Sequence, residues 1–143
     1  MKLIEAEYSP LNGVSFVSLK HKNKIYTGKA TYNIKEEKLP PSAFFGQRIA
    51  EYRAMIKYWK EKRDINRIKK QALESLLKDL EPDIQDGVEE DGLYEIILEK
   101  LERHIKYYDK ETNNCKKQIH YLKTEIKENL KTRKQLLDKV TKT

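Results

Sequence analysis

The sequence has few of the residues that build disulfides, zinc sites and membrane spans. Its 143 residues include one cysteine and three histidines. The single cysteine, Cys115, excludes an intrachain disulfide and is typical of a reducing compartment. The histidines have no cysteines at ligand spacing, so no metal site is predicted. No apolar run approaches the roughly 20 residues that cross a bilayer, and the N-terminus is too polar for a secretory signal. We therefore expect a cytoplasmic protein without membrane contact.

Signatures of catalysis and of cofactor binding are also missing. The chain contains no glycine-rich phosphate loop, no HExxH helix and no CxxC pair. No nucleophile lies beside a base, and no carboxylate pair lies in an apolar setting. We expect a protein that is not an enzyme and that carries no cofactor.

Charge and aromatic residues are abundant instead. Charged residues make up 37% of the chain, the mean hydropathy is -0.87 and the formal net charge is +7. Nine tyrosines, three phenylalanines and one tryptophan argue against disorder. These values predict one elongated domain, and the basic charge favours an acidic partner such as a nucleotide or a nucleic acid.

The first 38 residues predict a three-stranded antiparallel β-meander. Residues 2–8, 14–21 and 24–34 are rich in β-branched and aromatic side chains, and the Asn12-Gly13 dipeptide is typical of a tight turn. In the third strand one face is apolar. That face carries Gly28, which either marks a bulge, the simpler interpretation, or leaves room for a backbone or a ligand. Its side chains are Tyr26, Ala30, Tyr32 and Ile34.

Residues 39–59 join this sheet to a helix and combine aromatic with basic side chains. Pro40 and Pro41 end the extended segment, and Ser42 is a suitable N-cap. Apolar residues then recur every three or four positions, from Phe45 to Trp59. Arg48 and Arg53 flank this stripe. The stretch is either a core helix with solvated arginines or a phosphate-recognising edge beside a stacking surface.

The rest of the chain predicts a long antiparallel helical hairpin. The first helix is expected over 42–80, an acidic loop over 82–92 and a second helix over 93–140. The second helix carries a heptad repeat, and it spans roughly 70 Å against roughly 60 Å for the first. Its surplus apolar surface predicts a homo-oligomer. The fold class is therefore α+β. The heptad positions are Tyr94, Leu101, Tyr108, Cys115, Leu122, Asn129 and Leu136, each followed four residues later by Leu98, Ile105, Thr112, Ile119, Ile126, Arg133 and Val140.

A small nucleotide is the ligand that these residues fit most simply. It needs two or three cationic groups for its phosphates and one aromatic face for its base. The residues that could supply them are Arg48, Arg53, Phe44, Phe45, Tyr52, Lys20 and Lys29. The alternative is a basic helical interaction protein that binds nucleic acid, because many lysines line the second helix, although acids are interspersed among them.

Three segments of the N-terminal half resemble phage proteins of a Thoeris anti-defence family. They are LIEAEYSPLNGVSFVSL, KIYTGKA and SAFFGQRIAEYRAMIKYWK, within about the first 60 residues, whereas the later helices match only as lysine-rich heptads. The resemblance implies an oligomer of sheets and long helices in the host cytoplasm. It also implies non-catalytic sequestration of cyclic ADP-ribose-type signals made by TIR-domain enzymes, and in some members of cyclic oligonucleotides.

The same resemblance indicates which residues of this chain would contact the ligand. Its most recognisable segment contains Phe44, Phe45, Gly46, Arg48, Glu51 and Arg53. The resemblance does not extend to pocket residues after Trp59, and we expect separately that the interhelical loop with Ile84 and the following Tyr94 lies near a pocket. The alternative function is a protein that blocks a host defence complex, of the anti-CRISPR or anti-restriction type.

Overall fold

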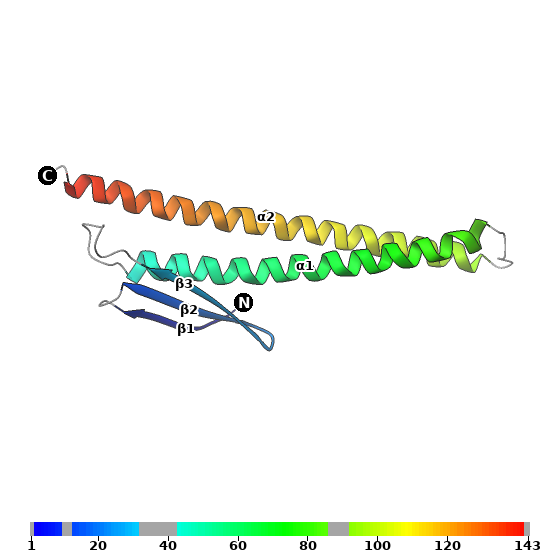
Figure 1. Ribbon diagram of the computed structural model, residues 1–143, viewed down its shortest axis with the longest axis horizontal. Helices are drawn as coiled ribbons and strands as arrows, with labels where there is room; N and C mark the ends of the chain where they lie inside the picture. The colour runs from blue at the N-terminus through cyan, green and yellow to red at the C-terminus, as the bar shows by residue number, and fades with distance from the viewer. Residues whose placement is uncertain (1, 10–12, 32–42, 86–91, 142–143) are drawn as a thin grey trace. The chain divides into compact units, whose positions relative to one another are not determined.

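The computed structural model describes residues 2–9, 13–31, 43–85 and 92–141, which form a small sheet followed by two long helices (Figure 1). This α+β arrangement confirms the predicted fold class. Oligomerisation stays a prediction. The elements are β1 (Lys2–Ser9), β2 (Val14–His21), β3 (Lys24–Thr31), α1 (Ala43–Gln85) and α2 (Leu93–Thr141).

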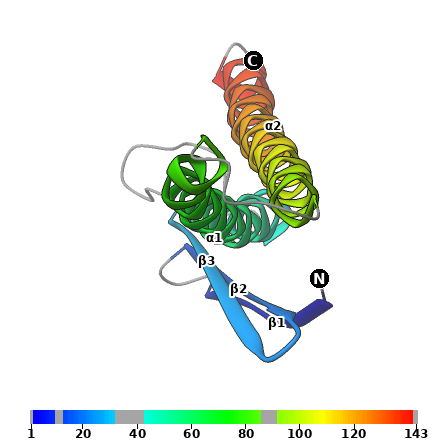
Figure 2. The same ribbon diagram turned by 90° about the vertical axis from the view of Figure 1, so that its right-hand side faces the viewer.

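The sheet is the predicted antiparallel meander, with strand order β1-β2-β3 (Figure 2). Gly13 and Lys22, which precede β2 and β3, adopt positive φ angles of 61° and 56°. The predicted apolar face of β3 is confirmed for Tyr26 and Ala30, which are each 8% exposed. Tyr32 and Ile34 lie outside the described residues. The register of β1 against β2 shifts between Leu3 and Glu5, so the sheet is irregular at its β1 border.

Helix α1 approaches the sheet closely at Gly28. The β2–β3 register is unbroken at this residue, so the bulge interpretation is wrong. A Cβ at Gly28 would overlap the backbone carbonyl oxygen of Ala50 and lie 2.7 Å from the backbone nitrogen of Ala54. The glycine and the two alanines, both fully buried, therefore let α1 lie directly on β3.

The described residues group into two compact units, and each is considered by itself. The sheet unit contains Met1–Trp59 and Gln118–Thr143, and the hairpin unit contains Lys60–Lys117. In the sheet unit, one core cluster joins Val17 and Leu19 of β2 to Ile49 of α1. A second cluster joins Ile56 of α1 to Ile119 and Leu122 of α2. The first part of α1 thus contacts both the sheet and α2.

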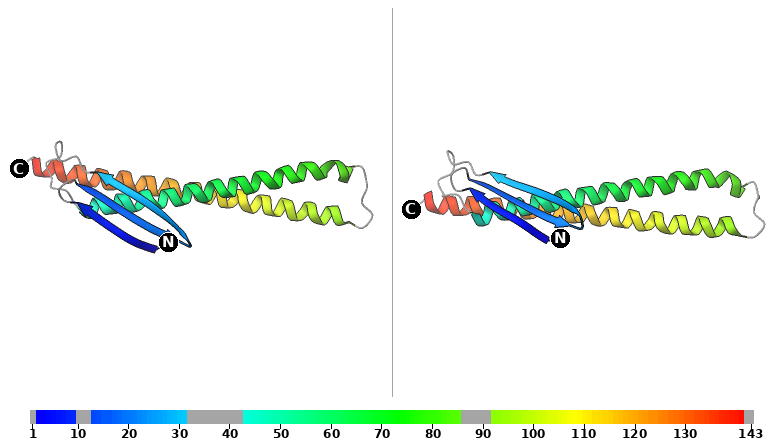
Figure 3. Two further views of the ribbon diagram at one scale, coloured as in Figure 1. Left: turned by 60° about the horizontal axis from the view of Figure 1, so that its bottom comes forward. Right: turned by 90° about the horizontal axis from the view of Figure 1, so that it is seen from below.

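The hairpin unit consists of the two helices packed antiparallel (Figure 3). Its seam contains Leu101, Thr112 and Cys115 of α2 and Asn66 of α1, which are all buried. The predicted heptads therefore form the seam here, and they continue as Ile119 and Leu122 in the sheet unit. At the end of α2 the pattern no longer coincides with burial, because Leu136 is 41% exposed.

Both helices begin where the sequence predicts, whereas α1 ends later than predicted. α2 begins at Leu93 as expected, and α1 begins at Ala43, directly after the predicted cap at Ser42, which lies outside the described residues. α1 continues to Gln85, whereas the sequence predicts an end near Leu80. Pro82 lies in the final turn, where its missing N–H removes only one intrahelical hydrogen bond. The acidic loop at 86–91 lies outside the described residues.

Candidate nucleotide-binding residues

Arg48 and Tyr52 form a cation and aromatic pair on one face of α1. They are one helical turn apart, and the Arg48 Nε donates a hydrogen bond of 2.9 Å to the Tyr52 hydroxyl oxygen. The guanidinium carbon also lies 5.8 Å from the centroid of the Tyr52 ring. Tyr52, then Glu51 and Glu125, raise the pKa of Arg48 above its ordinary value, so it stays charged. Arg48 is exposed while Tyr52 is half-buried, so the pair presents a fixed positive charge beside a ring edge.

Arg53 lies on a different face of the same helix. Its Nη1 donates a hydrogen bond of 2.7 Å to the backbone carbonyl oxygen of Lys29 in β3. Five residues correspond to about 140° of rotation around an α-helix, so Arg48 and Arg53 point in different directions. The structure brings Arg53 together with Lys29, and Arg48 together with Tyr52, but it does not bring the two arginines of one chain together.

The remaining predicted ligand residues are placed separately. Phe44 lies in the first turn of α1, but its side chain is outside the described part of the structure. Phe45 is half-buried in the same turn, and Lys29 has an exposed side chain. Tyr94 is half-buried at the start of α2 and belongs to the hairpin unit. Ile84 lies in α1, again with a side chain that is not described.

The sheet unit contains an aromatic cluster that the sequence does not predict. The Tyr58 ring lies edge-on to three others, with centroid distances of 4.8 Å to His21, 5.0 Å to Trp59 and 5.4 Å to Tyr26. The Lys24 Nζ lies 6.0 Å from the Tyr26 centroid. These residues come from β2, β3 and α1, so no local sequence pattern joins them. Their only signal is the high aromatic content of the N-terminal half.

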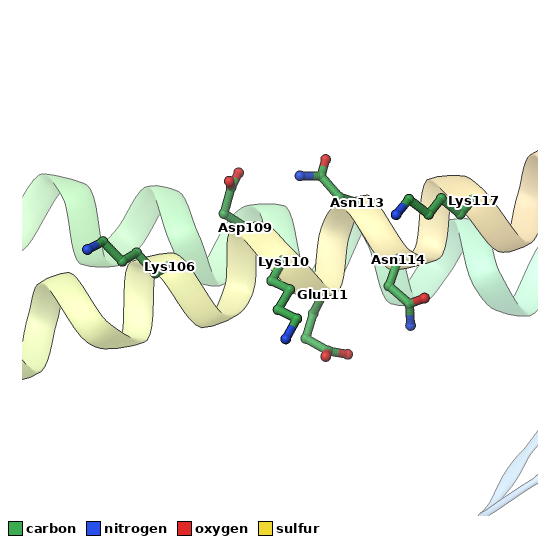
Figure 4. Close-up of a pocket in the computed structure, with 7 residues that line it drawn as sticks. All are labelled: Lys106, Asp109, Lys110, Glu111, Asn113, Asn114 and Lys117. Carbon is green, nitrogen blue, oxygen red and sulfur yellow. The ribbon is translucent and has the colours of Figure 1, made fainter.

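A charged hollow runs along α2 in the hairpin unit (Figure 4). In Figure 4, Asp109 and Asn113 project to one side of the helix, whereas Lys110, Glu111 and Asn114 project to the other. The hollow is therefore an open surface of a single helix rather than an enclosed pocket. The Lys70 Nζ of α1 forms an ion pair of 2.7 Å with Asp109. The residues that line the hollow are Lys106, Asp109, Lys110, Glu111, Asn113, Asn114 and Lys117.

The seam of the hairpin unit holds a buried thiol beside buried polar groups. Burial, and to a lesser extent Glu111, raise the pKa of the Cys115 thiol, while nearby Lys62 and Asn66 act in the opposite direction. The Asn66 Nδ2 is buried and has no hydrogen-bond partner among the described residues. His104 and His120 are both exposed. Within the described ranges, no group of three or more His, Cys, Asp or Glu side chains is arranged to hold a metal ion.

Comparison of the chain with protein-family models, with curated proteins and with solved structures gives no match in any of the three. Among the helices that the structure describes, none combines the length and the apolar character required to cross a membrane.

Proposed function

We propose that this protein binds a cyclic nucleotide signal of the cyclic ADP-ribose type and sequesters it without turnover. One observation carries the proposal: the exposed guanidinium of Arg48 is held by the Tyr52 hydroxyl and lies beside the Tyr52 ring. A phosphate is recognised by the planar donors of arginine, and a base by an aromatic side chain. The resemblance of residues 1–60 to the Thoeris anti-defence family supports the same ligand class.

The proposal gives each residue of the pair a separate role. Arg48 donates to the phosphate, and Tyr52 both orients the guanidinium and contacts the base or ribose. Arg53 and Lys29 form a second basic position, which would serve the same ligand only if two subunits each contributed an edge. A complete site then requires the homo-oligomer that the sequence predicts.

The decisive experiment is recovery of ligand from the purified protein. The protein is incubated with the products of a TIR-domain enzyme, freed of unbound ligand by gel filtration and denatured by heat, and the released material is identified by mass spectrometry. An intact cyclic nucleotide supports sequestration. A cleaved product indicates an enzyme, and release of no nucleotide overturns the proposal.

Three variants make this experiment specific for the pair. We expect Arg48→Ala to lower the recovered ligand by at least tenfold, because a charge-assisted contact to phosphate is lost. Tyr52→Phe keeps the ring but removes the hydroxyl that holds Arg48, so capture should fall to an intermediate level. Arg103→Ala is the matched control, because its side chain is 70% exposed and lies in the hairpin unit. Equal capture by all three variants would contradict the assignment of Arg48.

The charged hollow supports a second candidate function, binding of nucleic acid or of another acidic partner. Lys106, Lys110 and Lys117 lie at spacings of four and seven residues, so they follow one face of α2. Asp109 is held by Lys70, which reduces its repulsion of an approaching phosphate. The salt dependence of binding distinguishes the two candidate functions. Binding of a polyanion should weaken steeply as salt is raised, whereas capture of a desolvated nucleotide should change much less.

A further inference from the structure

The hairpin unit has two unlike sides, which are marked by two contacts between its helices. On one side, the Lys69 Nζ lies 5.5 Å from the centroid of the Tyr108 ring. On the other, the Lys70 Nζ forms the 2.7 Å ion pair with Asp109. Consecutive residues of a helix diverge by about 100°, so these neighbouring contacts lie on opposite sides of the seam.

The side marked by Lys69 and Tyr108 is apolar, and we call it the apolar face. Ile65 and Ala72 are one turn from Lys69 in either direction, and Leu76 follows one turn later. α2 contributes Tyr107, whose ring lies edge-on to that of Tyr108 with a centroid distance of 5.3 Å. These side chains are far more exposed than those of the seam. The exposed fractions on this face are 44% for Ile65, 46% for Leu76, 57% for Tyr107, 53% for Ile96 and 52% for Leu93.

The side marked by Lys70 and Asp109 is polar throughout, and we call it the charged face. α1 contributes Arg63, Arg67 and Glu74 to it, and Lys70 lies 3.8 Å from the Glu74 carboxylate. α2 contributes the members of the charged hollow that lie on the side of Asp109, including Lys106 and Lys117. Acids of α2 such as Glu95 and Glu102 share this face with its bases, so the face is charged but offers little apolar area.

Two helices alone cannot cover the apolar residues that this hairpin carries. Of its four buried seam residues, Asn66 and Thr112 are polar and only Leu101 is a large hydrophobic side chain. The exposed stripe lies roughly 120° around each helix from the seam. Apolar positions that face two directions on every helix are the pattern of a four-helix bundle.

We infer that the apolar face of the hairpin unit binds the same face of a second copy of this chain, so that two hairpins form a four-helix bundle. The available area suits this partner. Residues 60–85 of α1 span about 39 Å, and two adjacent helices are about 20 Å wide, which corresponds to about 800 Å² on each copy. That is the usual size of a specific protein interface.

Charge also favours a second copy on this face. The charged residues here are of both signs, with Lys69 and Lys100 against Asp79 and Glu111. The face is therefore close to neutral and does not repel itself. The inference does not depend on the proposed ligand, and it identifies which surface of the helices makes the oligomer.

The first test compares two double variants of the full chain by sedimentation velocity over a range of concentrations. Ile65→Glu with Leu76→Glu places charge on the apolar face. The control variant, Gln71→Glu with Lys78→Glu, places negative charge on the charged face of the same helix. We expect the wild type and the second variant to be dimeric or larger, and the first variant to dissociate at least 100-fold more readily. Circular dichroism checks that both retain their helices.

A second test maps the interface with a short bismaleimide cross-linker. Cys115 is fully buried and should not react in the folded protein, so an added cysteine is selective. We expect Ala72→Cys, on the apolar face, to give covalent dimers, and Gln71→Cys, its neighbour on the charged face, to give few. The inference is overturned if the wild type is monomeric, if the Ile65→Glu, Leu76→Glu variant associates like the wild type, or if Gln71→Cys cross-links as well as Ala72→Cys.

Discussion

Arg53 of α1 binds the backbone carbonyl oxygen of Lys29 in β3 through a hydrogen bond of 2.7 Å. β3 forms one border of the sheet, and the guanidinium fastens the helix to this border. An arginine that the sequence assigns to phosphate recognition is thus also a structural contact between helix and sheet. Binding of a ligand at Arg53 would have to keep or replace this hydrogen bond.

Removal of this contact should lower the stability of the sheet unit. We expect Arg53→Met, which keeps most of the aliphatic stem, to lower the free energy of unfolding by about 1 kcal/mol, because the net contribution of one such hydrogen bond is of that size. Urea denaturation followed by circular dichroism measures the change. Arg48→Met is the comparison, since the hydrogen bond described for Arg48 goes to Tyr52 of its own helix rather than to the sheet. An equal loss in both variants would contradict a specific role of the Arg53–Lys29 bond.

Gly28→Ala should be the most destabilising single methyl addition in the sheet unit. The new Cβ would collide with the backbone of α1 at Ala50, and a backbone cannot move away as a side chain can. We expect a loss of about 2 kcal/mol or more, in the range known for overpacked cores. The measurement is the urea midpoint together with its slope.

Gly46→Ala is the matched comparison, because its Cβ would meet the side chain of Ser15 rather than a backbone. Its loss should be smaller, and Ser15→Ala should restore part of it by removing the hydroxyl. If Gly28→Ala were the milder substitution, the close approach of α1 to β3 would be disproved.

Replacing Asn66 with an apolar residue should stabilise the hairpin unit. Asn66 is 7% exposed, and its Nδ2 has no hydrogen-bond partner in the described part of the chain. An unsatisfied buried polar group costs about 1–3 kcal/mol, so Asn66→Leu should raise the free energy of unfolding by about 1 kcal/mol or more. Asn113→Leu, at an exposed position, should not. Since a buried asparagine can fix helix register, we also expect the Asn66→Leu protein to form a less uniform set of oligomers in sedimentation experiments.

Cys115 should make the folded state less stable as the pH rises above about 8.5, the ordinary pKa of a cysteine. Burial raises the pKa of the folded thiol, so the unfolded thiol loses its proton first as the pH rises. Proton release from the unfolded state then favours unfolding, and the contribution is fully present only below that pH. Urea midpoints between pH 7 and 10 should fall more steeply for the wild type than for Cys115→Ala. Parallel slopes would show that the thiol titrates normally.

Much of the fold follows directly from local patterns. The apolar face of β3 and the heptads of α2 predict their elements correctly, because a strand repeats every two residues and a helix every 3.6. The end of α1 is predicted less well, since a proline can be accommodated in a final turn. For Gly28 the sequence leaves two interpretations open, and the structure rejects the bulge and shows the room for a backbone, which the sequence cannot decide because that backbone is more than 20 residues away along the chain.

The sequence predicts which residues could form the candidate site, but it does not predict how they are arranged in space. The sequence places Arg48 and Arg53 on one basic and aromatic stretch, but the rotation of the helix separates them and gives each a different partner. The cluster around Tyr58 is missed, since its members come from three elements. The apolar face of the hairpin unit is missed as well, because an exposed stripe and a buried seam have the same helical period in the sequence.

By itself, the sequence determines the order and type of the elements, because backbone hydrogen bonding and local apolar periodicity act between residues that are close along the chain. It also determines the basic charge and the aromatic content of the N-terminal half. Only the tertiary structure decides which face of α1 lies on the sheet, which arginine supports the fold and which apolar stripe stays exposed. Those outcomes depend on close packing between distant segments, where a single Cβ at Gly28 is enough to prevent the contact.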